Sequence, residues 1–487
     1  MIPVIDLFAG PGGLNEGFNS VRAADGARAF QTVASFEMDH WASETLRLRA
    51  AMRLLQSDGV LHSDYYRFLN GDIERWEDFA ALPHVAAALK AAEAEVHEHR
   101  LGENRDKTDS LIRTALAPHV DKPWVLIGGP PCQAYSLAGR SRRTNDSTFQ
   151  DDEKHFLFRE YLHIIERFEP TVFVMENVKG LLSSTNRGTK MFDLIRSDLS
   201  SPRPGLEYEI RSFVVDREPA ELSPRDFVIQ SEQYGVPQKR HRVILLGLRR
   251  GFEFGSFSPL ESRSPVTVRN AIEDLPRVRS QISPRGADTQ ASWEALRAYA
   301  LGEAGVTRPR KAPLAHESSR LGVPRAERDR TTYDEWVRDP HLRAVTLHES
   351  RSHMKDDLIR YGVLAGLAER TGRSLKLTDA AFQAFLPAHR NVGTPNTPFT
   401  DRFRVQLWDE PSSTVVSHIS KDGHYYIHPD PSQMRSLTVR EAARLQTFPD
   451  NYFFRGGRTQ QYHQVGNAVP PLLARQLSEV VVGLLGI

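Results

Sequence analysis

Five short apolar runs, separated by amphipathic stretches, constrain the fold of this chain most strongly. The runs are rich in β-branched residues and lie at 2–10, 32–39, 123–129, 171–178 and 241–248. Continuous apolar runs of this length are typical of a parallel sheet that is buried on both faces. A stretch with helical periodicity at 156–168 lies between two of them. The pattern predicts an α/β fold of doubly wound topology with a mostly parallel sheet.

The regular alternation stops soon after residue 250, which predicts a second domain. Proline, serine and arginine then occur together, as in the segment 307–313. We place the boundary near Pro265, so that residues 1–265 carry the sheet and residues 266–455 form an inserted, smaller domain. The final segment, 456–487, has an apolar helical pattern after two prolines, and we expect it to complete the core of the first domain.

Smaller elements are expected inside both domains. Residues 74–122 are predicted to form a helical insertion, whose apolar stripe consists of Val85, Leu89, Ala92 and Val96. In the second domain we expect a helix around 358–368 and strands at 401–408 and 413–419. Thr438 and Glu441 have the spacing of a capping box at the start of a further helix.

Cysteine content and charge exclude several classes of protein. Cys132 is the only cysteine among 487 residues, which excludes an internal disulfide and a zinc cluster held by several thiolates. The formal net charge is +1, so a nucleic-acid partner would have to be held by local basic patches. The sequence opens on an apolar strand pattern and lacks an apolar run of about 20 residues, which predicts a cytoplasmic protein without a membrane segment.

A glycine-rich turn and two acidic residues indicate an adenosine-type cofactor. Gly10, Gly12 and Gly13 follow the first apolar run, where glycine allows the backbone to approach a ligand closely. Glu37 ends the second run and is placed to accept hydrogen bonds from ribose hydroxyls, and Asp72 could accept one from an exocyclic amine. A tight turn without a ligand is the alternative interpretation.

A second group of side chains lies at the ends of the later apolar runs, after two of them and just before the last. Cys132 comes directly after the run at 123–129 and could act as a nucleophile, although a lone cysteine is more often inert packing. Glu176 ends the run at 171–178 and could donate a proton. Arg240 and Arg242 lie two residues apart and therefore on one side of an extended chain. Because open α/β sheets place their sites at the carboxyl ends of strands, we expect these groups on one rim.

Taken in order, these segments resemble the DNA (cytosine-5) methyltransferases. The resemblance rests on "DLFAGPGG", "FEMD", "GDI", "GGPPCQAYS", "ENVKG", "PQKRHRV", "SLTVREAARLQTFPD" and "QVGNAVPP". Two departures are a longer segment between Glu37 and Asp72 than the family usually has, and Lys154 where it usually has arginine. The resemblance implies a Rossmann-like catalytic domain that binds S-adenosyl-L-methionine, and an inserted target recognition domain.

The resemblance also implies site residues and a reaction. Cys132 would attack C6 of a flipped-out cytosine, while Glu176 and Arg242, with Arg240 beside them, stabilise the charge that develops on the ring. S-adenosyl-L-homocysteine would be the second product, and no metal is required. Implied cofactor contacts are Phe8, Gly10, Pro11, Gly13, Leu14, Glu37, Met38, Asp72, Ile73, Pro130, Leu157, Asn467, Ala468 and Val469. Implied DNA contacts are Gln133, Ser136, Arg140 and Thr414.

The expected substrate is a specific sequence in double-stranded DNA. The protein would be a monomeric modification enzyme, with a possible partner restriction endonuclease that acts on the same site without forming a stable complex. An RNA cytosine-5 methyltransferase is an alternative, disfavoured by the long inserted domain. A catalytically silent sensor of S-adenosylmethionine is another, disfavoured by the presence of Cys132, Glu176 and Arg242. A nicotinamide oxidoreductase is the weakest alternative, because Asn15 replaces the third glycine of the dinucleotide motif.

Overall fold

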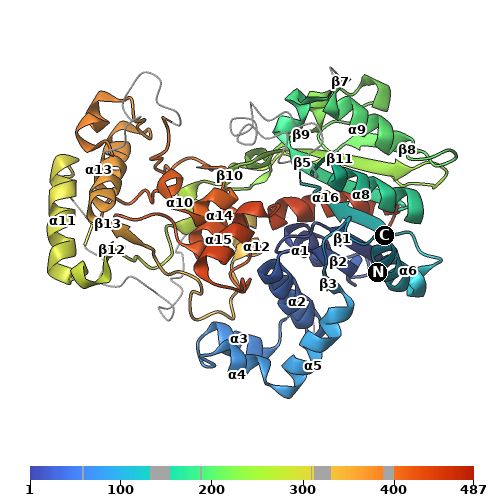
Figure 1. Ribbon diagram of the computed structural model, residues 1–487, viewed down its shortest axis with the longest axis horizontal. Coiled ribbons are helices and arrows are strands. Elements are labelled where there is room, and N and C mark those ends of the chain that lie inside the picture. Colours follow the sequence, from blue (N-terminus) through green and yellow to red (C-terminus); the bar gives the residue numbers. More distant parts are fainter. Residues whose placement is uncertain (57–59, 132–153, 187–188, 309, 312–330, 388–399) are drawn as a thin grey trace.

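A mostly parallel sheet lies at the centre of one half of the molecule (Figure 1). The computed structural model describes residues 1–487 except 57–59, 132–153, 187–188, 309, 312–330 and 388–399. Within the described residues the sheet has eight strands, in the order β3-β2-β1-β4-β5-β11-β8, with β9 paired to β11. Their bounds are β1 Ile2–Leu7, β2 Phe30–Glu37, β3 Val96–Glu98, β4 Val125–Gly128, β5 Val172–Val178, β8 Tyr208–Ser212, β9 Val228–Gln230 and β11 His241–Arg249.

The strand directions confirm the predicted α/β class. β3, β2, β1, β4 and β5 are parallel to one another. β11 is antiparallel to β5, β8 and β9, so the sheet has an antiparallel edge. The five predicted apolar runs form β1, β2, β4, β5 and β11, and most of their residues are buried. Burial on both faces of the sheet explains why these runs are apolar throughout.

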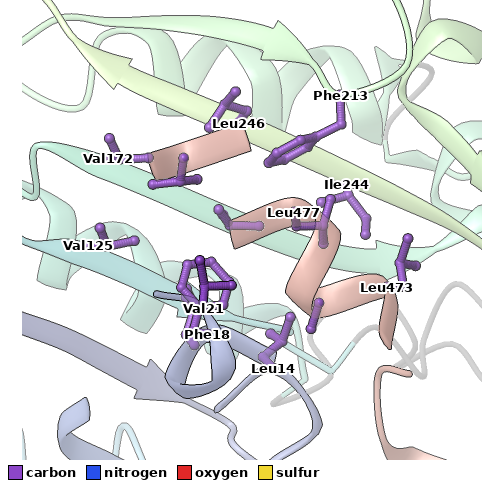
Figure 2. Packing of buried hydrophobic residues seen from close by; sticks show 14 of the residues in the cluster. Leu14, Phe18, Val21, Val125, Val172, Phe213, Ile244, Leu246, Leu473 and Leu477 are labelled. Carbon is purple, nitrogen blue, oxygen red and sulfur yellow. The ribbon is translucent and has the colours of Figure 1, made fainter. Parts of the chain in front are cut away.

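Helices cover both faces of the sheet. On one face, α1 (Gly13–Ser20) and α16 (Pro471–Leu485) pack against alternate residues of the strands, as Figure 2 shows for Phe18, Leu477 and Val125. On the other face lie α6 (Arg105–Leu116), α8 (Lys154–Phe168) and α9 (Met191–Ser200). The predicted helix at 156–168 corresponds to α8. The two hydrophobic clusters together make the doubly wound core.

The final helix returns to the first part of the chain, as the sequence predicts. A Cβ on Gly17 of α1 would lie 2.4 Å from the Cβ of Ala474 in α16, so the two helices touch closely at a glycine. The stretch Arg458–Leu485 has the length and hydropathy of a membrane-spanning helix, which the sequence-based expectation had excluded. It is divided into α15 (Arg458–Asn467) and α16. Of its most apolar 18-residue stretch, 61% is buried inside the protein. The core position of α16 accounts for this apolar character.

The region at 74–122 is only partly the helical insertion that was predicted. α4 (Trp76–Ala80) and α5 (Pro83–Ala91) are helical and pack with α2 (His40–Leu54) and α3 (Ser63–Leu69), and the predicted apolar stripe lies in this cluster. β3 and α6, however, belong to the central sheet and its cover. β3 was missed because it is a three-residue edge strand with only Val96 buried, so it shows no apolar run.

The later region forms a lobe and a connecting layer (Figure 1). α11 and α13, with the parallel pair β12 and β13, lie far from the central sheet, and α10, α14 and α15 lie between. The helix predicted around 358–368 is α13, and the capping box of Thr438 and Glu441 is present at α14. The bounds are α10 Val268–Ile272, α11 Gln290–Glu303, α12 Thr332–Val337, α13 Lys355–Thr371, α14 Val439–Leu445, β10 Gln238–Lys239, β12 Gln281–Ser283, β13 Ser352–Met354 and β14 Ser412–Ser413.

The strands predicted at 401–408 and 413–419 are wrong. The first segment has a single bridge, between Val405 and Ile427, and the second has only the two-residue β14 followed by a 3-10 turn at Ser417–Ser420. Their apolar residues are buried one at a time, Phe403 against the α13 cluster and Val415 against the α14 cluster. Apolar residues that are buried one at a time therefore resembled a strand pattern, although the described residues form only one bridge and the short β10–β14 pair here.

Candidate active site

The turn that follows β1 contains residues with left-handed backbone conformations. The φ angle is 56° at Phe8, 55° at Gly10 and 90° at Gly12. Glycine adopts such angles readily, whereas Phe8 is held there at a cost of about 1–3 kcal/mol. A Cβ on Gly10 would meet no described atom within 4 Å, so space is open beside the turn. The positive end of the α1 dipole lies at the same place, because α1 begins at Gly13.

Residues 467–469 lie against this turn. A Cβ on Gly13 would lie 2.1 Å from the carbonyl oxygen of Val469, so only glycine allows this approach. Ala468 is buried, whereas Asn467 is exposed. The structure thus brings together two predicted cofactor segments from opposite ends of the chain.

Leu14 does not face the turn. Its side chain is 5% exposed and packs in the core with Leu473 and Leu477 (Figure 2). The cofactor contact predicted for Leu14 therefore stays a prediction that concerns the backbone at this position rather than the side chain.

Tyr452 is a part of the site that sequence reasoning missed. Its hydroxyl donates a hydrogen bond to the carbonyl oxygen of Pro11, and its ring is buried beneath the guanidinium of Arg49, 4.6 Å from the ring centroid. Tyr452 and Pro11 are 441 residues apart in sequence. No local spacing could have linked them, so the fold alone reveals that the turn is held from the carboxyl-terminal side.

Glu37 ties the glycine turn to the second strand. One carboxylate oxygen accepts from the Gly10 amide at 2.8 Å, and the other accepts from the amides of Met38 and Asp39 at 2.9 and 2.8 Å. Burial raises the pKa of the Glu37 carboxyl, while these amide hydrogen bonds act in the opposite direction. Met38 is 67% exposed, so its apolar surface is available to a ligand.

Asp72 and Ile73 do not lie where the sequence motif placed them. They follow α3 outside the central sheet, where Asp72 pairs with Arg343 at 2.6 Å and Ile73 packs in the cluster of α2 to α5. The strand beside β2 is β3, in which Glu98 stands opposite Glu37. Glu98, and not Asp72, therefore lies at the strand end beside Glu37. The sequence "GDI" did not indicate the residue beside Glu37, because α4 and α5 lie between this motif and β3.

Glu176 on β5 and Arg242 on β11 form an ion pair. The antiparallel register sets Glu176 opposite Ile244 and Arg242 opposite Val178, which makes the two charged side chains diagonal neighbours on one face. Arg242 Nε lies 2.7 Å from Glu176 Oε1, and both side chains are 14% exposed. A Cβ on Gly129 would lie 2.8 Å from Glu176 Oε2, so this glycine leaves room for the carboxylate.

The segment that leads to the cysteine starts beside this pair. Asn177 Nδ2 donates to the Pro130 carbonyl oxygen at 3.3 Å, which fixes the chain just after β4. Leu157 lies near the start of α8 and is half-buried. The predicted residues Cys132, Gln133, Ser136 and Arg140 lie outside the described residues.

Arg240 has different surroundings from Arg242. It is buried, and its Nη1 donates to the carbonyl oxygens of Val415 at 2.7 Å and Gly466 at 3.3 Å. Burial, together with the nearby charge of Arg242, lowers the pKa of Arg240 to about 9. Arg240 therefore joins three segments of chain, and its predicted part in catalysis stays a prediction.

Thr414 lies at the same junction. β14 pairs in parallel with β10, and Thr414 Oγ1 donates to the Lys239 carbonyl oxygen at 2.6 Å. This contact brings Thr414 next to the segment that carries Arg240 and Arg242. Its predicted contact with DNA stays a prediction.

Comparison with known proteins assigns the family. A model described as C-5 cytosine-specific DNA methylase matches residues 93–482. The chain belongs to this family. A type II methyltransferase, M.Bpa9945I of Bacillus paralicheniformis, is 36% identical over 506 residues and is covered over 99% of each chain. M.AgeI of Thalassovita gelatinovora, also a type II methyltransferase, is 30% identical over 76% of this chain and 85% of its own.

A solved structure shares the fold of this C-5 cytosine-specific DNA methylase. It is described as a DNA modification methyltransferase encoded within a prophage of E. coli, and it superimposes with a TM-score of 0.55 over 100% of both chains. Its sequence identity is 17%, so the likeness concerns the fold alone.

The different surroundings of the two arginines predict different effects of substitution. We expect Arg240→Met to lower the free energy of unfolding by about 2 kcal/mol, because two buried carbonyl groups lose a charged donor. Arg242→Met should change stability less but lower the rate of methyl transfer to DNA by about 100-fold. Urea denaturation and transfer of a radiolabelled methyl group measure the two effects. Equal loss of stability in both variants would contradict this division.

Proposed function

We propose that this DNA (cytosine-5) methyltransferase methylates one specific sequence of double-stranded DNA through a covalent intermediate at Cys132. The observation that carries the proposal is the Glu176–Arg242 ion pair at the strand ends, where Asn177 fixes the start of the segment that contains Cys132. A carboxyl, a guanidinium and a thiol are the groups needed to make a pyrimidine ring reactive at C5 without a metal.

The proposed reaction assigns one role to each group. The Cys132 thiolate adds to C6 of cytosine, N3 takes a proton from the Glu176 carboxyl, and Arg242 donates hydrogen bonds to O2. These steps leave an enamine whose C5 is nucleophilic. After C5 has gained its methyl group, a base removes the C5 proton and the C6–S bond breaks. N3 then returns its proton to the Glu176 carboxylate, so the thiolate, the carboxyl group and the aromatic ring are all restored.

S-adenosyl-L-methionine supplies the methyl group when bound, and S-adenosyl-L-homocysteine remains. The residues around the glycine turn fit such a molecule, since Gly10 leaves open space and Met38 presents an exposed apolar surface. We propose that Phe8, Gly10 and Pro11 contact it, with Glu37 and Met38 at the ribose and adenine. Gly13, Pro130, Leu157, Asn467, Ala468 and Val469 complete the proposed contacts.

Glu98 takes the place of Asp72 in this proposal. It lies opposite Glu37 at the carboxyl end of the parallel strands, where nucleotides bind in open α/β sheets. His40 Nδ1 lies 2.9 Å from one of its carboxylate oxygens, and the Glu98 side chain is 42% exposed. The remaining oxygen can accept a hydrogen bond from the adenine amine.

DNA binding is proposed for the side of the protein where the Glu176–Arg242 pair and Thr414 lie. C6 of cytosine cannot be reached inside a duplex, so the base must be flipped out at a cost of a few kcal/mol. Gln133, Ser136, Arg140 and Thr414 are proposed to contact the DNA around it. We propose that residues 266–455 act as the target recognition domain, inserted between 1–265 and 456–487.

The biological setting is proposed by analogy with the relatives. M.Bpa9945I and M.AgeI are type II methyltransferases. We propose that the protein acts as a cytoplasmic monomer and protects its target sequence from a partner endonuclease.

The proposed activity predicts a methylation pattern in living cells. Expression in a bacterial host without cytosine-5 methylation should produce 5-methylcytosine at one short sequence motif in almost every genomic copy, which bisulfite sequencing detects. Cys132→Ser is the control and should leave the genome unmethylated. A wild-type protein that is produced and binds S-adenosylmethionine but methylates no motif would favour a silent regulator.

The covalent step is tested on that motif with 5-fluorocytosine at the target position. Because fluorine cannot leave C5 as a proton does, we expect a stable protein–DNA adduct that resists denaturing electrophoresis. Cys132→Ser should form no adduct. Since Cys132 is the only cysteine, an adduct that survives this substitution would overturn the assignment of the nucleophile.

The position of the two carboxylates predicts which one binds the cofactor. We expect Glu98→Gln to raise the dissociation constant of S-adenosylmethionine about tenfold, because a charged acceptor is lost. Asp72→Asn is the matched control and should change it less than about twofold, since Asp72 pairs with Arg343. Isothermal titration calorimetry measures both, and the opposite order would restore Asp72 to the site.

A further inference from the structure

We propose that His62, Asp64 and His84 form a structural zinc site, which is independent of the methyl-transfer reaction. His62 caps the start of α3, Asp64 lies in its first turn, and His84 lies in the first turn of α5. Figure 1 shows α3, α4 and α5 together at one edge of the molecule, away from the central sheet. A metal ion here would join the beginnings of two helices that are separated by α4 in sequence.

The ligand atoms converge on one point. Asp64 Oδ2 lies 3.1 Å from His84 Nε2 and 3.8 Å from His62 Nδ1. All three ligand atoms lie within 4.8 Å of one another. Atoms bound to tetrahedral zinc at about 2.0–2.1 Å are about 3.3 Å apart, so small side-chain rotations complete the geometry. The two imidazole rings are already stacked obliquely, with centroids 4.5 Å apart.

Both histidines have a nitrogen that is available to a metal. His84 Nε2 is buried, and among the described residues it makes no hydrogen bond, because its approach to Asp64 lacks hydrogen-bond geometry. His62 Nδ1 accepts a hydrogen bond from the Asp64 amide at 3.2 Å, which keeps its lone pair on Nδ1. Metal binding would exchange this long hydrogen bond for a stronger interaction.

The donor set selects the class of metal. Two imidazoles and one carboxylate suit zinc, whereas calcium and magnesium prefer sites made of oxygen alone. Arg67 pairs with the other oxygen, Asp64 Oδ1, at 2.7 Å, which orients the carboxylate and leaves Oδ2 to the histidines. The three side chains are partly exposed, so water can fill the fourth position.

The site would stiffen a contact between two parts of the chain. The helices around it hold the segment at 339–343 by several hydrogen bonds, including Tyr66 to Asp339 at 2.7 Å and the Arg343 amide to Asn70 at 2.7 Å. Tyr66 and Asn70 belong to α3 and its end, the same helix that carries Asp64. Zinc between α3 and α5 would therefore stabilise the surface on which this later segment rests.

Zinc content and thermal stability test the proposal. After exposure to zinc and dialysis, we expect the full-length protein to retain a single zinc ion per chain, measured by mass spectrometry, and to lose thermal stability when a chelator removes it. His84→Ala and Asp64→Asn should weaken zinc binding by more than about tenfold and make stability independent of the chelator.

Two controls separate this site from other ligands. His163 lies 3.0 Å from Asp109 without a third ligand group recorded among the described residues, so His163→Ala should keep the zinc. Cys132→Ser should also keep it, which excludes the lone thiol as the ligand. Cobalt should give the visible absorption of a tetrahedral site in the wild type and in both controls, but not in His84→Ala or Asp64→Asn. Absence of zinc from the wild type, or equal zinc in the wild type and in correctly folded His84→Ala and Asp64→Asn, would overturn the proposal.

Discussion

The close approach of Val469 to Gly13 is the contact on which the rest of the site depends. Because a Cβ on Gly13 would lie 2.1 Å from the Val469 carbonyl, this position has no alternative to glycine. The contact holds the carboxyl-terminal segment against the first strand–helix turn, and α16 then completes the core beside α1 (Figure 2). Tyr452 secures the same turn through Pro11. The chain between the first domain and α16 is therefore held in place at the glycine turn.

Buried charge fixes the segment that carries Tyr452. Arg435 makes two hydrogen bonds of 2.6 Å to Glu441, and Arg444 pairs with Asp450 at 2.8 Å. Burial alone would raise the pKa of the Glu441 and Asp450 carboxyls, but the adjacent arginines hold both below their usual values. Removing one partner from such a buried pair costs about 3–5 kcal/mol, so the segment has little freedom to adopt another geometry.

Sequence reasoning succeeded where a physical pattern was local. The apolar runs predicted the strands because both faces of the sheet are covered. The motifs identified Glu176 and Arg242, and these two side chains meet because β11 runs antiparallel to β5. It failed where a strand was too short to show a pattern, or where a similar pattern occurred without the expected structure. β3 has only Val96 buried, "GDI" stands before an insertion of helices, and the segment 401–408 alternates in burial without a partner strand.

The sequence by itself determined the α/β class, the glycine turn, the family and the identity of the acid and arginine at the rim, since each is written in local periodicity or in a contiguous motif. Only the tertiary structure decided that Glu98 stands beside Glu37 and that Asp72 pairs with Arg343. The same holds for Arg240, which joins Val415 and Gly466, and for Tyr452, which holds Pro11. These contacts join residues far apart in the chain. The packing that brings them together cannot be inferred from the spacing of residues along the sequence.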